Sequence, residues 1–365
     1  MTRITCIGCG HPYPETGVPY ICPRCGGVFD YAEWPTYNSA MIDSAAPGIW
    51  RYQSAFGLPA SALPVSLGEG KTPLVWSEVD GRPVAFKLEF LNPSGSYKDR
   101  GSATLVSFLL SRGVSSAVED SSGNAGASYA AYAARAGIHA KVFIPDSASG
   151  PKRDQIRVYG AETVSILGPR SNATEAVRRA ADGGEVYASH AYLPFGLPGY
   201  ATIAYELVEQ LGTAPGTVMA PVGQGNLLLA IGRGFSAMRH AGTISREPML
   251  VGVQARACAP LWAVFQYGAA GLGWVTEGDT LAEGVRVKHP LRGDALLQML
   301  WANRGMLLAV DEENILMGRD RLARLGFYVE PTSAILWDGL NQISEQIPEP
   351  VVLILTGSGL KTSKT

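Results

Sequence analysis

The stretch Asn92-Pro-Ser-Gly-Ser-Tyr-Lys-Asp-Arg-Gly101 decides the fold and the chemistry that the sequence predicts. It places Lys98 between a glycine-containing turn and a run of helix-forming residues, Ser102 to Leu110. A lysine at such a junction lies at the edge of a pocket, where it can lose hydration and act as a nucleophilic amine. Taken alone, however, this signal is weak and a solvated surface residue is the better interpretation, because most lysines are solvated surface groups.

Two further glycine-containing stretches strengthen the first interpretation. Ser121-Ser-Gly-Asn-Ala-Gly126 follows a predicted strand at Ala117–Ser121, and Pro221-Val-Gly-Gln-Gly-Asn226 follows a predicted strand at 217–222. In parallel α/β sheets, ligands bind at such strand-to-helix loops. The three stretches together indicate a pocket for a phosphorylated cofactor whose aldehyde is held by Lys98.

The second glycine loop is the candidate phosphate cradle, because two glycines let backbone N–H groups approach an anion at a helix N-terminus. Its candidate residues are Gly223, Gln224, Gly225 and Asn226. The alternative is a bare tight turn. The loop lacks the Lys-Ser/Thr ending of a nucleotide-binding P-loop, so ATP is not favoured.

The first glycine loop offers donors of a different kind. Ser121 and Ser122 could hold a substrate carboxylate, and the Asn124 amide could bond a phenolic oxygen. The alternative for Ser122 and Asn124 is N-capping of the following alanine-rich helix, predicted over Asn124–Ala136. Thr356 ends the last predicted strand, and its hydroxyl could face a ring nitrogen.

Elsewhere, short apolar runs alternate with helical patterns, which predicts an α/β fold with helices on both faces of mainly parallel sheets. The pattern includes short predicted strands at Glu185–Ser189 and Phe327–Val329, and an irregular region from Gly268 to Arg292.

The N-terminal segment, residues 1–35, contains two Cys-x-x-Cys pairs, Cys6/Cys9 and Cys22/Cys25. Two such pairs can supply four thiolates to one structural Zn²⁺. The alternatives are a site that has lost its metal, or four ordinary thiols.

Composition limits the remaining classes. The chain has 365 residues, 46% of them hydrophobic and 17% charged, with a net charge of −2. These values favour a globular protein of about two domains and argue against a nucleic-acid partner. No apolar run is long enough for a membrane span, and the N-terminus has no apolar signal core, so we expect a cytoplasmic protein.

The ordered set of motifs resembles the threonine synthases among the fold-type II pyridoxal-phosphate (PLP) enzymes, the tryptophan-synthase-β-like superfamily. The motifs are Gly68-Glu-Gly-Lys-Thr-Pro-Leu74, Lys87 to Gly101, Ser121-Ser-Gly-Asn124, Pro221-Val-Gly-Gln-Gly225, Glu330-Pro-Thr-Ser333 and Thr356-Gly-Ser-Gly-Leu360. The cysteine-containing head is similar to the N-terminal segment of many prokaryotic members. Ala125 and Gly126 replace the Thr and Ser that are common in the family, and Ser358 replaces a usual His.

The resemblance implies a role for each candidate. Lys98 would carry PLP, Asn124 would bond its hydroxyl, the loop from Gly223 to Asn226 would hold its phosphate, and Thr356 would face its ring nitrogen. A second phosphate, on the substrate, requires further donors. The candidates for this second phosphate are Lys71, Ser94, Ser96, Lys152 and Arg153, together with Ser121 and Ser122. Taken singly, each of these residues is also explained as a surface residue or as a helix cap.

The resemblance also implies an organisation and a reaction. The zinc-ribbon-like segment would be followed by a large PLP domain formed by 36–102 and 191–365, and by a small α/β domain at 103–190. We expect a homodimer that converts O-phospho-L-homoserine and water to L-threonine and phosphate. The alternatives are a cysteate-synthase-like enzyme, a threonine dehydratase, or a catalytically silent regulatory or sulfur-relay protein.

Overall fold

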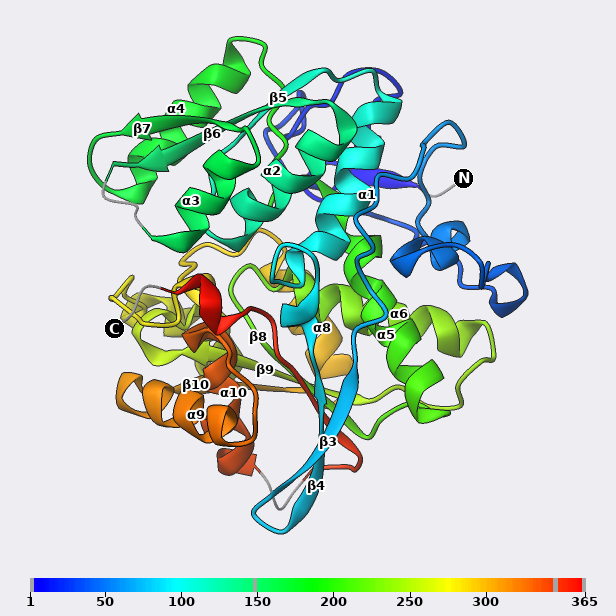
Figure 1. Ribbon diagram of the computed structural model, residues 1–365, viewed down its shortest axis with the longest axis vertical. Coiled ribbons are helices and arrows are strands. Elements are labelled where there is room, and N and C mark those ends of the chain that lie inside the picture. Colours follow the sequence, from blue (N-terminus) through cyan, green and yellow to red (C-terminus); the bar gives the residue numbers. More distant parts are fainter. Residues whose placement is uncertain (1–2, 147–149, 344–346, 363–365) are drawn as a thin grey trace. The chain divides into compact units, whose positions relative to one another are not determined.

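The computed structural model describes residues 3–146, 150–343 and 347–362. The chain divides into two compact units (Figure 1). The first comprises Met1–Gly70, Asn92–Tyr200 and Lys361–Thr365, and the second comprises Lys71–Leu91 and Ala201–Leu360. The chain passes from the first unit to the second inside helix α5 (Leu197–Leu211). The domain boundaries that the resemblance implies stay a prediction.

The first unit contains a parallel three-stranded sheet in the order β5-β6-β7. The strands are β5 (Ser116–Glu119), β6 (His139–Pro145) and β7 (Glu162–Ile166). The helices are α1 (Lys98–Ser111), α2 (Asn124–Ala136), α3 (Pro151–Val158) and α4 (Arg170–Asp182). In Figure 1, α4 covers one face of this sheet, and α2 and α3 lie on the other.

Helix α2 has the bounds that the sequence predicts. Its alanine-rich run is buried along most of its length, and Gly137 ends it with φ at 70°. A left-handed residue at this position satisfies the last carbonyls of a helix, and glycine adopts it without a Cβ penalty.

The N-terminal segment packs within the first unit. Its antiparallel strands β1 (Ile4–Cys6) and β2 (Phe29–Tyr31) form a two-stranded ribbon. The Tyr13 ring contacts Phe29 edge-on at 4.7 Å between centroids, and also meets Phe108 of α1 and Phe195. Aromatic contacts therefore join the cysteine-containing head to the helix that begins at Lys98.

The second unit contains a six-stranded sheet in the order β10-β9-β8-β11-β4-β3, parallel except for the β3–β4 hairpin at one edge. The strands are β3 (Leu74–Val79), β4 (Arg82–Lys87), β8 (Thr217–Pro221), β9 (Met249–Ala255), β10 (Met306–Val310) and β11 (Val351–Ile354). The helices, besides the greater part of α5, are α6 (Asn226–His240), α7 (Pro260–Tyr267), α8 (Gly293–Ala302), α9 (Glu312–Arg324) and α10 (Pro331–Ile343).

Adjacent residues of β9 show that helices cover both faces of this sheet. A Cβ on Gly252 would meet Leu228 of α6, whereas the next residue, Val253, lies against Gly339 of α10. Because successive side chains of a strand point to opposite faces, α6 and α10 pack on opposite sides. This confirms the α/β architecture predicted from the alternating pattern.

Short 3-10 helices complete the described chain. They are η1 (Ser39–Met41), η2 (Gly48–Ala55), η3 (Glu89–Leu91), η4 (Pro194–Gly196), η5 (Arg256–Cys258), η6 (Gly268–Trp274), η7 (Glu283–Val285) and η8 (Gly359–Lys361). Among the described residues, we find no helix with the length and apolar character that a bilayer crossing requires.

Two predicted strands are wrong. Glu185–Ser189 and Phe327–Val329 each contribute only an isolated bridge, from Tyr187 to Val118 and from Val329 to Ser358. At the first of these, the Ser189 hydroxyl accepts the N–H groups of Ala191 and Tyr192, which bends the chain into a turn.

Candidate active site

Helix α1 begins at Lys98 itself, and its first turn is fixed by the buried carboxylate of Asp99. Asp99 Oδ2 accepts the Ser94 N–H at 2.6 Å, and Oδ1 accepts the hydroxyls of Ser94 at 2.5 Å and Ser128 at 2.6 Å. Burial raises the pKa of Asp99, while these hydrogen bonds and the charge of Lys361 oppose the rise. The turn before Lys98 is therefore held from inside the first unit.

Aromatic rings surround the Lys98 side chain, which is partly buried. Its Nζ lies 4.9 Å from the centroid of the Tyr97 ring and 6.0 Å from that of Tyr200. A Cβ at Gly101 would come within 2.3 Å of the Tyr200 ring, so only glycine fits at this position of α1. The predicted placement of a lysine between a turn and a helix is confirmed.

The loop Ser121–Gly126 connects β5 to α2, also in the first unit. Ser121 Oγ accepts the Gly123 N–H at 3.3 Å, which leaves Asn124 as the first residue of α2. A Cβ on Gly126 would lie 1.8 Å from the Ser121 carbonyl oxygen. The absence of a side chain at Gly126, a departure from the family pattern, is therefore required by this tight turn.

Two residues beside this loop were not singled out from the sequence. Glu119 ends β5 fully buried, and its Oε1 lies 2.6 Å from Nδ1 of His190. The sequence signal was an acidic pair, Glu119-Asp120, placed directly before Ser121 at the end of an apolar strand.

The glycine loop of the second unit leads from β8 into α6, as predicted. Gly225 has φ at 81° and precedes Asn226, the first residue of a 15-residue helix. A Cβ on Gly223 would lie 2.8 Å from the Gly284 carbonyl oxygen. Gln224 Oε1 accepts the Leu291 N–H at 3.0 Å, which ties the loop to the segment before α8. The loop therefore requires glycine at these two positions and leads into a helix N-terminus, where proteins commonly bind anions.

Thr356 follows β11, also in the second unit, and is buried. Its Oγ1 lies 2.8 Å from Ser333 Oγ, and Ser333 Oγ also accepts the Thr356 N–H at 2.8 Å and the Gly357 N–H at 3.2 Å. The Glu330-Pro-Thr-Ser333 and Thr356-Gly-Ser-Gly motifs, far apart in sequence, therefore meet through one serine hydroxyl.

The candidates for binding the substrate phosphate differ in their surroundings. Lys71 is exposed, with φ at 50°, whereas Ser94 is buried and its hydroxyl donates to Asp99. Ser96 Oγ is buried and has no hydrogen-bond partner among the described residues. Lys152 and Arg153 lie in the first turn of α3, where Arg153 Nη2 donates weakly to Ser165 Oγ at 3.3 Å.

The four cysteine thiols of the head converge. The Sγ atoms of Cys6, Cys9, Cys22 and Cys25 all lie within 4.8 Å of one another. The closest pairs are Cys6 with Cys25 at 3.4 Å and Cys9 with Cys22 at 3.7 Å. A tetrahedral Zn²⁺ with Zn–S bonds of ~2.3 Å requires sulfur–sulfur separations of about 3.8 Å.

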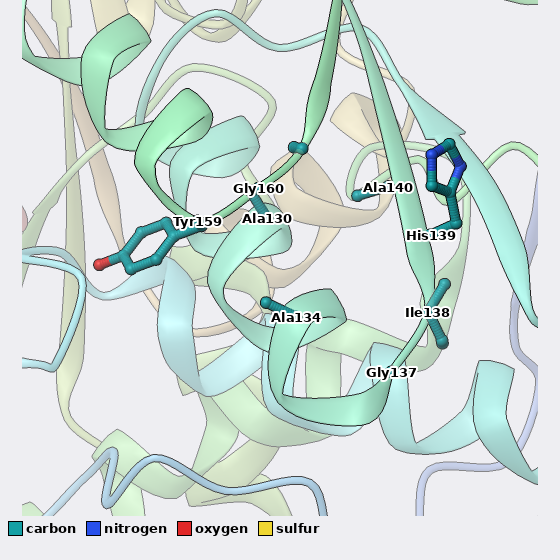
Figure 2. A pocket seen from close by; sticks show the side chains of 9 residues that line it. Ala130, Ala134, Gly137, Ile138, His139, Ala140, Tyr159 and Gly160 are labelled. Carbon is teal, nitrogen blue, oxygen red and sulfur yellow. The ribbon is translucent and has the colours of Figure 1, made fainter.

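A cavity of about 320 Å³ lies in the first unit. Figure 2 shows its lining by Ala130 and Ala134 of α2, by His139 and Ala140 of β6, and by Tyr159 after α3. None of the candidate residues lines it.

Comparison with known proteins agrees with these features. Residues 65–357 match the family of pyridoxal-phosphate dependent enzymes. The chain is 31% identical to a threonine synthase of Methanosarcina acetivorans, over 100% of this chain and 93% of that protein. It is 33% identical to a threonine synthase of Methanocaldococcus jannaschii, over 98% of this chain and 92% of that protein.

Solved structures share the fold. A threonine deaminase from T.th. has a TM-score of 0.68 at 26% identity, covering 80% of this chain and 94% of that one. Maize serine racemase, at 21% identity with the same TM-score and covering 80% of this chain and 88% of that one, shows the fold alone. With matches of this extent, the chain belongs to the pyridoxal-phosphate dependent enzyme family and, within it, to the threonine synthases.

Proposed function

We propose that this protein converts O-phospho-L-homoserine and water to L-threonine and phosphate. The observation that carries the proposal is the identity of 31% and 33% to two threonine synthases over nearly the whole of each chain. The structural likeness to a threonine deaminase covers less of the chain and has lower identity. Threonine deamination is therefore the alternative that the assays must exclude.

The residues fit PLP in three respects. A Cβ at Gly223 or Gly225 would clash with a neighbouring residue, so both positions require glycine. A loop without side chains at these positions would leave its backbone N–H groups accessible to a phosphate. Lys98 supplies a primary amine on a rigid helix start. Thr356 offers a neutral hydroxyl, which would leave a ring nitrogen unprotonated, where a carboxylate would favour its protonation.

We therefore assign the contacts as the family resemblance implies them. Lys98 would hold the cofactor covalently, and Asn124 would bond its phenolic oxygen. Gly223, Gln224, Gly225 and Asn226 would hold its phosphate, and Thr356 would face its ring nitrogen. When bound, PLP supplies the sink for the electrons that remain when a proton leaves the substrate Cα.

The chain's own residues then bind the substrate and move protons. The Lys98 amine would take and return protons at Cα and Cβ, phosphate would leave from Cγ, and water would add at Cβ. The substrate phosphate needs charge-assisted donors because it is desolvated on binding. We propose that Lys71, Lys152 and Arg153 supply the positive charges. Backbone N–H groups at the start of α3 would add to the charges of Lys152 and Arg153. The further hydrogen-bond donors would be Ser94, Ser96, Ser121 and Ser122.

Activity assays on three substrates test the function. We expect threonine and phosphate to be released from O-phosphohomoserine, with competition by inorganic phosphate, and little turnover of threonine or O-phosphoserine. Borohydride trapping and peptide mapping should label Lys98, whereas a label on Lys71 or Lys87 would overturn that assignment. If the protein binds PLP but releases no threonine from O-phosphohomoserine, the proposed reaction is wrong.

A charge-neutralising variant tests the substrate phosphate site. The double substitution Lys152→Gln and Arg153→Gln should raise KM at least tenfold for the phosphorylated substrate and leave KM for unphosphorylated analogues nearly unchanged, because a charge-assisted bond to phosphate contributes about 1.5–3 kcal/mol. Arg157→Gln, on an exposed position of the same helix, is the matched control. Equal changes for both substrate classes would remove these two residues from the site.

We also propose that Cys6, Cys9, Cys22 and Cys25 bind one structural Zn²⁺. Four convergent thiols support this. A closed four-cysteine site leaves no open coordination position for catalysis, so the metal would be structural. A homodimeric assembly and a cytoplasmic location are expected from the family resemblance and from the sequence. Both stay predictions, which size-exclusion measurements and cell fractionation can check.

A further inference from the structure

Ser94, a buried residue of the turn before Lys98, is held by opposite charges on its two sides. Its N–H donates to Asp99 Oδ2 at 2.6 Å, and its hydroxyl donates to Asp99 Oδ1 at 2.5 Å. On the other side, its carbonyl oxygen accepts a hydrogen bond from Lys361 Nζ at 2.7 Å. Every polar group of Ser94 therefore has a charged partner, and all three residues belong to the first unit.

Lys361 is a buried cation near the C-terminal end of the chain. It ends η8, and only 7% of the residue is exposed. Lysine is seldom buried without a specific contact, because its charge is costly to remove from water. Asp99 is fully buried as well, and the charge of Lys361 opposes the rise that burial causes in the pKa of Asp99. The two buried charges therefore compensate each other across Ser94.

A neutral side chain donates to the same carbonyl. Gln155 Nε2, on α3, lies 3.0 Å from the Ser94 carbonyl oxygen and 3.0 Å from the Tyr159 hydroxyl. Charge-assisted hydrogen bonds are shorter and roughly twice as strong as neutral ones. The bond from Lys361 is the shorter of the two, so we expect Lys361 to contribute more than Gln155 to holding this carbonyl.

The turn that Ser94 stabilises leads directly into Lys98. The N–H of Asp99 donates to the Ser96 carbonyl at 3.3 Å, which closes the turn around Lys98. Asp99 is also the carboxylate that binds Ser94, so the backbone on each side of Lys98 is fixed by the same contacts. Position matters for a nucleophile, because a misplacement of ~1 Å can slow a reaction by about 100-fold.

We propose that Lys361 is a positioning residue for the Lys98 amine. By binding the Ser94 carbonyl and compensating the charge of Asp99, it fixes the turn from which Lys98 extends. The inference rests on the proposed role of Lys98 in holding PLP. In that attachment the Lys98 amine attacks the aldehyde carbon, a C=N bond forms, and the aldehyde oxygen leaves as water. Lys361 neither gains nor loses a proton in this step; it sets where the amine lies when the attack begins.

The rate at which PLP attaches to the apoprotein tests this without any substrate. Visible absorbance and borohydride trapping are followed over a range of PLP concentrations. Lys361→Met should lower the maximal rate at least tenfold, the effect expected from the loss of a hydrogen bond to a charged group. The half-saturating PLP concentration should stay within about threefold of wild type, because the proposed phosphate loop at Gly223 keeps all its residues. A loss of stability alone would lower the amount of protein that reacts, not its maximal rate.

Matched variants separate the charge of Lys361 from its bulk. Lys361→Arg keeps the charge and should recover most of the rate, whereas Gln155→Met removes the neutral donor and should slow attachment less than Lys361→Met. Asp99→Asn combined with Lys361→Met should attach PLP faster than Lys361→Met alone, because no uncompensated charge remains beside Lys98. The control is Lys141→Met, which removes a partly exposed ion pair with Glu185 in the same unit and should react at the wild-type rate.

Three results would overturn the proposal. The first is a maximal rate in Lys361→Met within about twofold of wild type. The second is a Lys141→Met variant that is slowed as much as Lys361→Met. The third is a borohydride label on a lysine other than Lys98, which also removes the proposed role of Lys98. If Lys361→Met does not fold, Lys361→Gln replaces it, and a wild-type rate in that variant is equally decisive. Failure to release threonine from O-phosphohomoserine would refute the proposed reaction alone, since attachment is measured without substrate.

Discussion

The buried ion pair between Lys87 and Glu206 should be the most stability-sensitive contact of the second unit. Lys87 Nζ lies 2.7 Å from Glu206 Oε2, with side-chain exposures of 0% and 3%. The same ammonium donates to the Thr72 carbonyl at 2.7 Å and to Gln210 Oε1 at 3.0 Å. Glu206 Oε1 accepts the N–H of Lys71, which has φ at 50°. The pair therefore fixes the turn that carries a candidate phosphate ligand.

We expect Lys87→Met to destabilise the protein by about 3–5 kcal/mol, the cost of leaving a buried charge without its partner. The gross attraction at 2.7 Å is roughly 6 kcal/mol at an effective dielectric of about 20, which is large enough to support that figure. Replacing both partners, as in Lys87→Met with Glu206→Gln, should recover at least half of the loss, because no uncompensated charge remains.

Urea denaturation of the three variants measures these differences. The control is Arg82→Met, on the same strand as Lys87. This substitution removes the partly exposed ion pair between Arg82 and Glu349 and should cost about 0–1 kcal/mol of stability. A loss below about 1 kcal/mol for Lys87→Met, or a double variant less stable than the single one, would refute the argument from buried charge.

Two further predictions concern the ligands. Gly225→Asp should weaken PLP binding far more than Gly225→Ala. Both variants strain a residue at φ 81°, but only aspartate adds a negative charge, which repels a phosphate charge by ~4 kcal/mol at ~4 Å and an effective dielectric of about 20. Equal PLP contents in the two variants would reject the phosphate-binding role of this loop. Metal analysis of protein purified without added zinc should find one Zn²⁺ per chain. Chelation of that metal should expose the cysteine-containing head to proteolysis, while the visible absorbance of bound PLP persists. Protein that contains no metal would contradict the zinc site and leave the four cysteines as ordinary thiols.

Local sequence predicted those elements whose signals are themselves local. Helix α2 is bounded by Gly123 and by Gly137 in the left-handed conformation, so its two ends are encoded within one segment. The glycine loop before α6 was predicted for the same reason. By contrast, α7, α8 and β10 were not predicted. Helix α7 was missed although Pro260 and Gly268 bound it with local start and stop signals.

The polar contacts that fix the candidate site were beyond local patterns because their partners are distant in sequence. The N–H of Lys71 meets Glu206 across 135 positions, and Glu119 meets His190 across 71. A charged side chain inside an apolar run indicates that it has a partner, since an unpaired buried charge is costly, but it does not say which residue that partner is. Glu119 at the end of β5 and Lys87 at the end of β4 both carry that signal. A buried charge that ends a strand beside a functional loop is therefore a reason to search for a positioning residue elsewhere in the chain, and here that search leads to His190 and Glu206.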